Sequence, residues 1–575
     1  MVRNGNTYKV GLVICCNIIM VCLLSSVGFA EFQYDWNVRT DQYGKGAGVF
    51  DVTPFPIDET VTTYAVIYDE GTVTYNLGTI YFVDNNASGC SNGTTTYNPQ
   101  NRTCGGGSGT VYTTIANGLS AVTSGNKTIL IREGTYRESY LNPKSGADDT
   151  HRYMLCGYKQ ERPIIDGNND PTNDIVRGTG QTNAYVTLQR LKIQNGQASG
   201  ILMGDDLSTR DGYVNIVDVW VYNVPNSSTG VRRNAGIYMM NADNAHIYHC
   251  TSERHYGHCY KIGDGADNAI VEWSVAKECG YYPGMPETSY YNSHPMGIDF
   301  PNDTGAYDDS GSNHVARYNI VYDVLFYGIY TRRTPNITVH HNEVYNASRC
   351  WAQMSNPSGD CENHSEGNYQ TELSIGPTSG NWYSNLIRDP GNQYGGHIKI
   401  TSCDTGNPVL NIYNNILYGG GAEAIMISEN NTGATISLMN NTVYGNHGKP
   451  IIISYMAASA VILKNNILYQ DGSGSCLSVG QAVHANNQYY YPHGSRGILL
   501  GAGEADGNAD DFVSLPSGSY NPNALVLKHN ILGENLSSFF TRDFNSGTRS
   551  LWTKGAYEYK GVGVSAPSNL RIAPN

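Results

Sequence analysis

A repeat of about 25 residues in the C-terminal half of the chain constrains the fold more than any other feature. Val409–Tyr418, Thr435–Tyr444 and Val461–Tyr469 share an alternation of apolar and polar residues, an Asn-Asn pair and a second apolar run, and Val483–Tyr489 is a weaker copy. The pairs begin at 414, 440, 465 and 486, so the spacings are 26, 25 and 21 residues. Each unit predicts two strands joined by a tight bend at Asn.

The same form appears upstream in Val315–Tyr322 and Asn336–Tyr345. A period near 25 residues is too short for a propeller blade, and the units lack the Leu/Asn signature of leucine-rich repeats. In a parallel β-helix each coil stacks about 4.8 Å along the axis, so recurring asparagines lie above one another. We therefore predict an all-β, parallel β-helix whose bends carry a ladder of side-chain amides.

Segments at both ends of this region resemble secreted right-handed parallel β-helix proteins of the pectate-lyase-like superfamily. The segments that carry the resemblance are Tyr81–Asp84, Tyr112–Val122, Lys127–Tyr136, Phe540–Phe544 and Lys554–Glu558. The second contains Ile115, Leu119 and Val122 on one helical face. The resemblance covers roughly residues 78–560 and implies a β-helix domain with an N-terminal amphipathic helix cap. It does not fix an activity, because this scaffold hosts lyases, hydrolases, epimerases and adhesins.

The chain begins with a segment typical of export. Arg3 and Lys9 precede an apolar run from Val10 to Leu24, and small residues follow up to Ala30. We predict a signal peptide over residues 1–30 and a secreted or cell-surface protein. No later segment is long and apolar enough to span a bilayer. Residues 31–77 lack the repeat and stay unplaced, and residues 561–575 are predicted to be a flexible tail.

Charge and cysteine content narrow the partners and the compartment. The formal net charge is −14, which argues against nucleic acid as a partner because phosphate binding needs a basic surface. Three of the 13 cysteines leave with the signal, so ten remain and permit five disulfides in an exported chain. The pairs expected first are Cys90–Cys104 and Cys350–Cys361, followed by Cys250–Cys259.

Each coil is expected to add a further strand after the Asn bend, in quartets such as Gly236–Met239 and Gly297–Phe300. Alternation predicts that the second and fourth residues point inward and that the first and third point outward. The outward third column then reads Leu202, Tyr238, Lys261, Asp299, Tyr330, Ser374, Lys399, Met426 and Ile452. The first column is mostly glycine, which would leave room beside the charged side chains, and it continues into Glu372 and His397. Arg332, two residues after Tyr330, is expected on the same side.

This predicted face is a candidate binding surface, although a solvated sheet face would also carry charges. Long insertions at residues 281–295 and 346–370, rich in Tyr and Trp, flank the same coils and are expected to form its walls. Aspartates at the following bends are candidate Ca²⁺ ligands, because stacked carboxylates repel one another unless a cation lies between them. They are Asp243, Asp264, Asp267 and Asp303. Ordinary Asp and Asn turn chemistry is the alternative explanation.

Three functions fit the face. The leading hypothesis is a polysaccharide lyase that cleaves an extracellular, uronate-containing polysaccharide by β-elimination, with Lys261 or Lys399 as base, Arg332 holding the carboxylate, and Tyr330 or His397 as acid. A glycoside hydrolase would use Asp299 and Glu372, two coils and about 10 Å apart. The third is a non-catalytic glycan-binding or adhesion protein. These roles rest on register alone.

Overall fold

The computed structural model describes most of the chain between residues 57 and 559. Within that range it leaves out residues 69–70, 169, 171–172, 179–183, 197, 205–210, 225–234, 264, 281–294, 302–310, 333, 348–370, 376–378, 389–395, 402–408, 421–422, 429–433, 446–450, 455–460, 481, 514–525 and 545.

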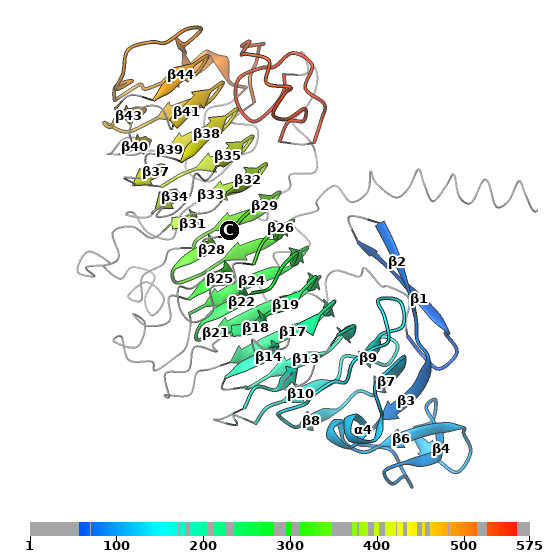
Figure 1. Cartoon of the computed structure of the whole chain (residues 1–575). Helices are drawn as coiled ribbons and strands as arrows, with labels where there is room; N and C mark the ends of the chain where they lie inside the picture. The colour runs from blue at the N-terminus through cyan, green and yellow to red at the C-terminus, as the bar shows by residue number, and fades with distance from the viewer. Residues whose placement is uncertain are drawn as a thin grey trace, which may run out of the picture.

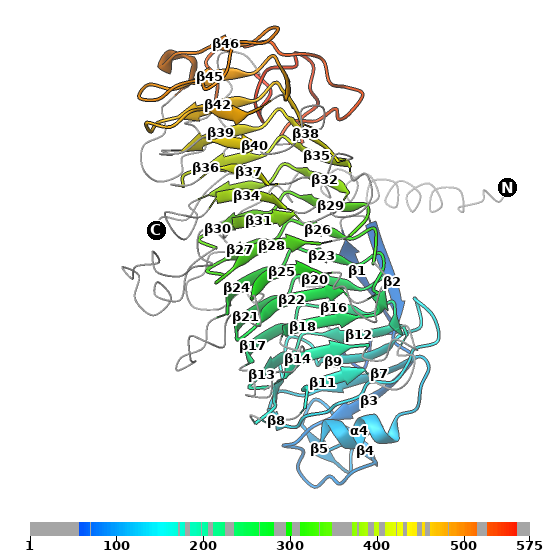
Figure 2. The same ribbon diagram turned by 60° about the vertical axis from the view of Figure 1, so that its left-hand side comes forward.

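The repeat folds into coils that stack along one axis, and each full coil contributes one strand to each of three long parallel sheets (Figures 1 and 2). Sheet 1 contains β3 (Thr79–Val83), β7 (Lys127–Ile131), β9 (Tyr153–Gly157), β12 (Val186–Gln189), β16 (Asn215–Val217), β20 (His246–Tyr248), β23 (Ile270–Glu272), β26 (Val315–Arg317), β29 (Ile337–His340), β32 (Gly380–Tyr383), β35 (Val409–Tyr413), β38 (Thr435–Met439), β41 (Val461–Lys464) and β44 (Val483–Ala485).

Sheet 2 follows sheet 1 after the Asn bend. It contains β8 (Thr135–Arg137), β10 (Ile164–Asp166), β13 (Lys192–Gln194), β17 (Trp220–Val224), β21 (Thr251–His255), β24 (Val275–Cys279), β27 (Ile320–Tyr322), β30 (Glu343–Tyr345), β33 (Leu386–Arg388), β36 (Ile416–Tyr418), β39 (Thr442–Gly445), β42 (Ile467–Gln470), β45 (Gln488–Tyr490) and β46 (Ala505–Asp506).

Sheet 3 closes each coil. It contains β11 (Val176–Gly178), β14 (Ser199–Met203), β18 (Ala235–Met240), β22 (His258–Gly263), β25 (Met296–Phe300), β28 (Tyr327–Thr331), β31 (Thr371–Ile375), β34 (Gly396–Thr401), β37 (Ile425–Ser428), β40 (Ile452–Ser454) and β43 (Leu477–Val479). One continuous apolar core fills the space between the three sheets, so the prediction of a right-handed parallel β-helix is confirmed.

The predicted amide ladder is present inside the bend between sheets 1 and 2. Asn441 Nδ2, for example, donates to Asn466 Oδ1 of the next coil at 3.1 Å and to the Ile412 carbonyl oxygen at 2.8 Å. The second Asn of each pair occupies this buried position, and Asn319, Asn342 and Asn385 extend the ladder toward the N-terminus. Every rung thus satisfies polar groups that the bend would otherwise bury without a partner.

The first Asn of each pair has a different task. Asn414, Asn440 and Asn465 adopt φ values of 56°, 51° and 56°, a left-handed conformation that Asn tolerates better than most residues. Their side chains bind the C-terminal segment, residues 526–559: Asn440 Nδ2 donates to the Thr553 and Gly555 carbonyl oxygens. This segment returns along the C-terminal coils and is drawn in red in Figure 1, and its Phe540 stacks on Tyr413.

Two elements cover the N-terminal coils. The predicted cap helix is α4 (Ile115–Ala121), and its predicted inner residues Ile115 and Leu119 are buried, as is Val122 at its C-terminal end. Residues 57–76, which the sequence left unplaced, include the antiparallel hairpin of β1 (Thr63–Tyr68) and β2 (Gly71–Asn76). Tyr64 and Tyr75 of this hairpin pack against side chains on the outer side of sheet 1.

The remaining elements are short. They are β4 (Thr94–Asn98), β5 (Thr103–Cys104), β6 (Gly109–Tyr112), β15 (Asp211–Gly212), β19 (Ala242–Asp243) and the 3₁₀ turn η4 (Ala509–Asp511). In the described part of the chain, no helix is long and apolar enough to cross a membrane. The predicted signal peptide, residues 1–30, and the predicted tail, residues 561–575, lie outside the described residues.

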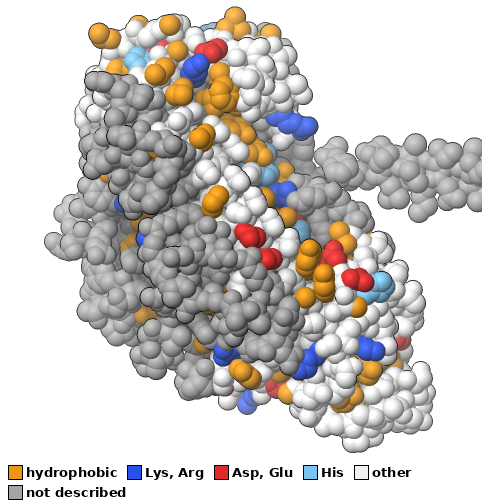
Figure 3. Space-filling model, in the orientation of Figure 1, with side chains coloured by type: hydrophobic (Ala, Val, Ile, Leu, Met, Phe, Trp, Pro, Cys, Tyr) orange, Lys and Arg blue, Asp and Glu red, His pale blue; other side chains and the backbone are white. Residues whose placement is uncertain are grey.

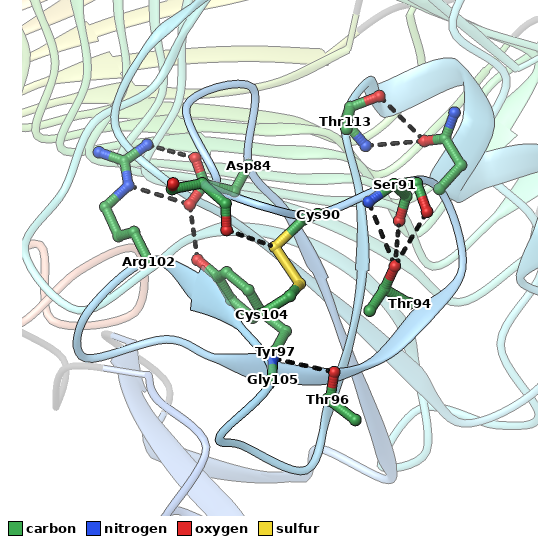
Figure 4. Close-up of a disulfide and its surroundings, with 12 residues drawn as sticks. Asp84, Cys90, Ser91, Thr94, Thr96, Tyr97, Arg102, Cys104, Gly105 and Thr113 are labelled. Atoms are coloured by element: carbon green, nitrogen blue, oxygen red, sulfur yellow. Dashed lines mark hydrogen bonds and ion pairs between the residues drawn. A yellow bond between two sulfur atoms is a disulfide. The ribbon is translucent and has the colours of Figure 1, made fainter.

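Disulfides test the cysteine predictions. Cys90–Cys104 is confirmed and lies beside the Asp84–Arg102 ion pair (Figure 4). The pairing of Cys250 with Cys259 is wrong, because Cys259 faces sheet 2 and bonds to Cys279 at the end of β24. The expectation of five disulfides is also wrong, since the described residues contain three buried free thiols, Cys156, Cys250 and Cys476. The pair Cys350–Cys361 lies outside the described residues.

Candidate functional site

The outer face of sheet 3 carries the predicted polar column. Register pairs link Lys261 to Asp299, Asp299 to Tyr330, Tyr330 to Ser374 and Ser374 to Lys399, each one strand further along the axis. The column prediction is wrong at its C-terminal end. Ile453, not Ile452, pairs with Met426, whereas Ile452 pairs with Ile425 and is 1% exposed within the core.

The prediction that the first column faces solvent is wrong. A Cβ on Gly236 would lie 2.5 Å from His255 Nε2 of sheet 2, so this column is small because two sheets meet there. His397 occupies the same register position and is fully buried, and its Nε2 donates to the Tyr418 carbonyl oxygen at 2.9 Å. Burial lowers the pKa of His397 to about 4. His397 is therefore not an acid on the solvent face.

Two residues that sequence reasoning missed join this face. His258 Nδ1 lies 3.2 Å from Asp299 Oδ2, and the Tyr327 ring stacks on Tyr330 with centroids 5.3 Å apart. His258 directly precedes Cys259, and Tyr327 directly precedes Gly328; Cys259 and Gly328 are the first-column residues of β22 and β28. At this point in each strand the chain departs from the simple alternation of inward and outward residues. Their alignment with Ala235 and Met296 is the sequence signal that could have revealed them.

The charged part of the face is less exposed than a solvated sheet would be. Lys261 is 6% exposed and Asp299 is 2% exposed. The Lys261 ammonium lies 4.8 Å from the centroid of the Tyr238 ring, and Tyr238 belongs to a small apolar cluster with Leu202 and Ala235 outside the main core. Buried charges are costly unless they interact with specific groups, so this arrangement is not an incidental solvated surface.

The other cations lie further along the face. Lys399 is partly exposed, three strands beyond Asp299 or about 14 Å of axis. Burial lowers the pKa of Lys399 below that of an ordinary lysine. Arg332 follows β28, and its main-chain N–H donates to the Phe300 carbonyl oxygen at 3.1 Å. Glu372 of β31 is aligned with His397 of β34. The side chain of Glu372 lies outside what the structure describes.

The candidate calcium ligands are engaged in turn contacts where the structure describes them. Asp243 Oδ1 accepts the main-chain N–H of Asp267 at 2.9 Å, and Asp267 Oδ1 accepts the N–H of Ser312 at 2.7 Å. The described residues contain no group of three His, Cys, Asp or Glu side chains that could hold a metal. Asp264 and Asp303 lie outside the described residues. Calcium binding stays a prediction, and no step below depends on it.

Charged side chains are sparse among the described atoms in the view of Figure 3, in keeping with a charged content of 15%. Against that background, two ammonium groups, a carboxylate, a histidine and three tyrosines lie on one outer face of sheet 3. The arrangement offers cations for an anionic group, groups that could transfer protons, and aromatic rings for contact with a sugar.

Comparisons with known proteins concern the fold. No protein-family model and no curated protein matches the sequence. Solved structures resemble the chain at low sequence identity and low TM-score. Pectate lyase Pel9A is 15% identical with a TM-score of 0.36, covering 84% of this chain and 98% of that one. The surface adhesin PfbA of Streptococcus pneumoniae is 14% identical with a TM-score of 0.40, covering 69% and 87%.

A third similar structure, the GH136 lacto-N-biosidase from Eubacterium ramulus, is 10% identical with a TM-score of 0.41, covering 75% of this chain and 67% of that one. At these identities the likeness extends to the architecture alone. The functional proposal therefore rests on this chain's own residues.

Proposed function

We propose that the outer face of sheet 3 binds an acidic extracellular polysaccharide and cleaves it by β-elimination. One observation carries the proposal: a single register column places Lys261, Asp299, Tyr330 and Lys399 on one face of a rigid parallel sheet. A polymer that runs along the axis would pass over these groups in succession, and Tyr330 and Lys399 are more exposed to it than Lys261 and Asp299. The two disulfides support a location outside the cell, where such a substrate occurs.

The chemistry needs a base, an acid and a cation for the uronate carboxylate. The base removes the C5 proton, the electron pair forms the C4–C5 double bond, the C4–O bond breaks, and the leaving oxygen takes a proton from the acid. Lys399 suits the base, since burial lowers its pKa and raises the neutral fraction. Arg332 or Lys261 would hold the carboxylate, and Tyr330 would supply the proton.

A screen on polygalacturonate, alginate and other polyuronates tests this function. Ultraviolet absorbance detects the unsaturated end that elimination creates, a reducing-end assay detects hydrolysis, and a binding assay detects a non-catalytic binder. Absorbance and reducing ends appearing together support a lyase. Reducing ends without absorbance would favour a hydrolase using Asp299 and Glu372, and binding without either signal would favour an adhesion role.

A further inference from the structure

The charges on β22 and β25 pair in a way that the register alone does not predict. Lys261 and Asp299 are register partners, so about 4.8 Å separates their backbones and an ion pair between them is within reach. Instead, Asp299 Oδ2 lies 3.2 Å from His258 Nδ1. The Lys261 ammonium lies over the ring of Tyr238, on the opposite neighbouring strand, 4.8 Å from its centroid.

The partner of Asp299 decides which group contacts the Lys261 ammonium, while the summed charge of the three side chains is the same in either arrangement. Among the described residues, no carboxylate lies within 4.0 Å of the Lys261 ammonium. A Lys261–Asp299 pair would be electrically neutral and would compete with any anionic ligand. Because Lys261 and Asp299 are only 6% and 2% exposed, solvent and salt would screen the attraction between their side chains weakly. The contact with His258 lies toward the other end of β25 from Lys261's ammonium and draws the Asp299 carboxylate in that direction.

We infer that His258 is a positioning residue that makes this face specific for anionic ligands. By engaging Asp299, His258 keeps the Lys261 ammonium available for the carboxylate of a bound uronate. The aromatic ring of Tyr238 supports the same arrangement, since it attracts the cation without neutralising it. The identity of the ligand rests on the proposed function, whereas the pairing of the three side chains does not.

Three full-length variants test the inference. In His258→Leu, Asp299 is expected to turn toward Lys261, and a crystal structure should place the carboxylate within about 4 Å of the ammonium. Calorimetry with oligogalacturonate and oligomannuronate should then show affinity about tenfold weaker or worse, because the ligand must displace an internal ion pair. His258→Asn, which places an amide near the position of Nδ1, should keep Asp299 in place and bind like the parent.

The double variant His258→Leu/Asp299→Asn separates positioning from structural support. Removing the competing carboxylate charge should restore affinity for the anionic fragments toward the parent value. The inference is overturned if Asp299 stays apart from Lys261 in the His258→Leu structure, or if the double variant melts like the parent yet binds as weakly as the single one. If the parent binds no polyuronate, the proposed function fails, and the His258→Leu structure still decides the pairing.

Discussion

Asn487 Nδ2 donates to Glu504 Oε1 at 2.7 Å, and this contact ends the amide ladder inside the β-helix. Each preceding asparagine donates to the next along the axis, so the last amide needs an acceptor that no further coil supplies. Burial opposes ionisation of Glu504, but the hydrogen bonds from the Gly501 N–H, the Asn487 amide and the Tyr489 hydroxyl outweigh it and lower the pKa of this carboxyl group. A carboxylate thus completes a row of neutral amides.

Glu504→Gln should destabilise the C-terminal coils by about 1–3 kcal/mol, because at least one buried donor loses its acceptor. Chemical denaturation measures the change. Glu534→Gln is the matched control: its side chain is 41% exposed and pairs with Lys464 at the surface, so the cost should stay within about 0.5 kcal/mol. Equal effects in the two variants would contradict the special role of Glu504.

Buried histidines should make the fold sensitive to acid. Burial lowers the pKa of His255 and His341 to about 3, and of His314 and His397 to about 4. Below the ordinary pKa of 6.5 the unfolded chain binds these protons more readily, so stability is fully present above pH 6.5 and falls as the pH drops.

The expected slope is about 1.4 kcal/mol per pH unit for each such group, down to its folded pKa. Denaturation at a series of pH values measures it. His397→Gln keeps a donor for the Tyr418 carbonyl oxygen. Between pH 6.5 and about 4, the free energy of unfolding of this variant should therefore depend on pH less steeply than that of the parent, by the slope of one histidine. A slope identical to that of the parent would show that His397 is not held neutral.

Much of this architecture follows from the sequence, and the exceptions have physical causes. The repeat predicts the coil because Asn-Asn bends and alternating residues impose it locally. The repeat does not show that the side chains of Asn440 and Asn441 bind different parts of the protein, because their partners come from distant segments. Asn440 binds Thr553 of the C-terminal segment, and Asn441 binds Asn466 of the next coil.

The site shows the same limit. Lys261 and Asp299 follow from alternation, but His258 and Tyr327 do not, because the chain breaks its alternation where sheet 3 meets sheet 2. The burial of His397 has the same origin, since the residue aligned with the glycine column must face another sheet. Such packing between sheets is a tertiary property that residue spacing does not report.

Thiol chemistry gives a third prediction. Burial raises the pKa of Cys250 and Cys476 to about 12, and also raises that of Cys156. Since the thiolate is the reactive form, these three thiols should resist alkylation in the native protein and react only after unfolding. Mass spectrometry before and after denaturation measures the labels. Rapid labelling of the native chain at any of the three would contradict their burial.

Neighbouring residues of β34 give a fourth prediction. Ile398 points into the core and is fully buried, so Ile398→Ala should cost about 2–5 kcal/mol of stability. Lys399 lies on the outer face, and Lys399→Ala should cost about 1 kcal/mol or less. Denaturation curves of the two variants measure the difference. The opposite ranking would mean that the inward and outward faces of sheet 3 are exchanged.

The most direct test of the proposed function is the ultraviolet elimination assay on polyuronates with the parent protein and Lys399→Arg. Arginine keeps the positive charge but does not deprotonate, so the variant should fold and bind like the parent while its rate falls on the order of 10² to 10⁴. The elimination rate of the parent should rise with pH as Lys399 loses its proton. The midpoint of this rise should lie below pH 10.5, because burial lowers the pKa of Lys399. A parent that produces no unsaturated ends from any polyuronate, or a Lys399→Arg variant as fast as the parent, would contradict the account.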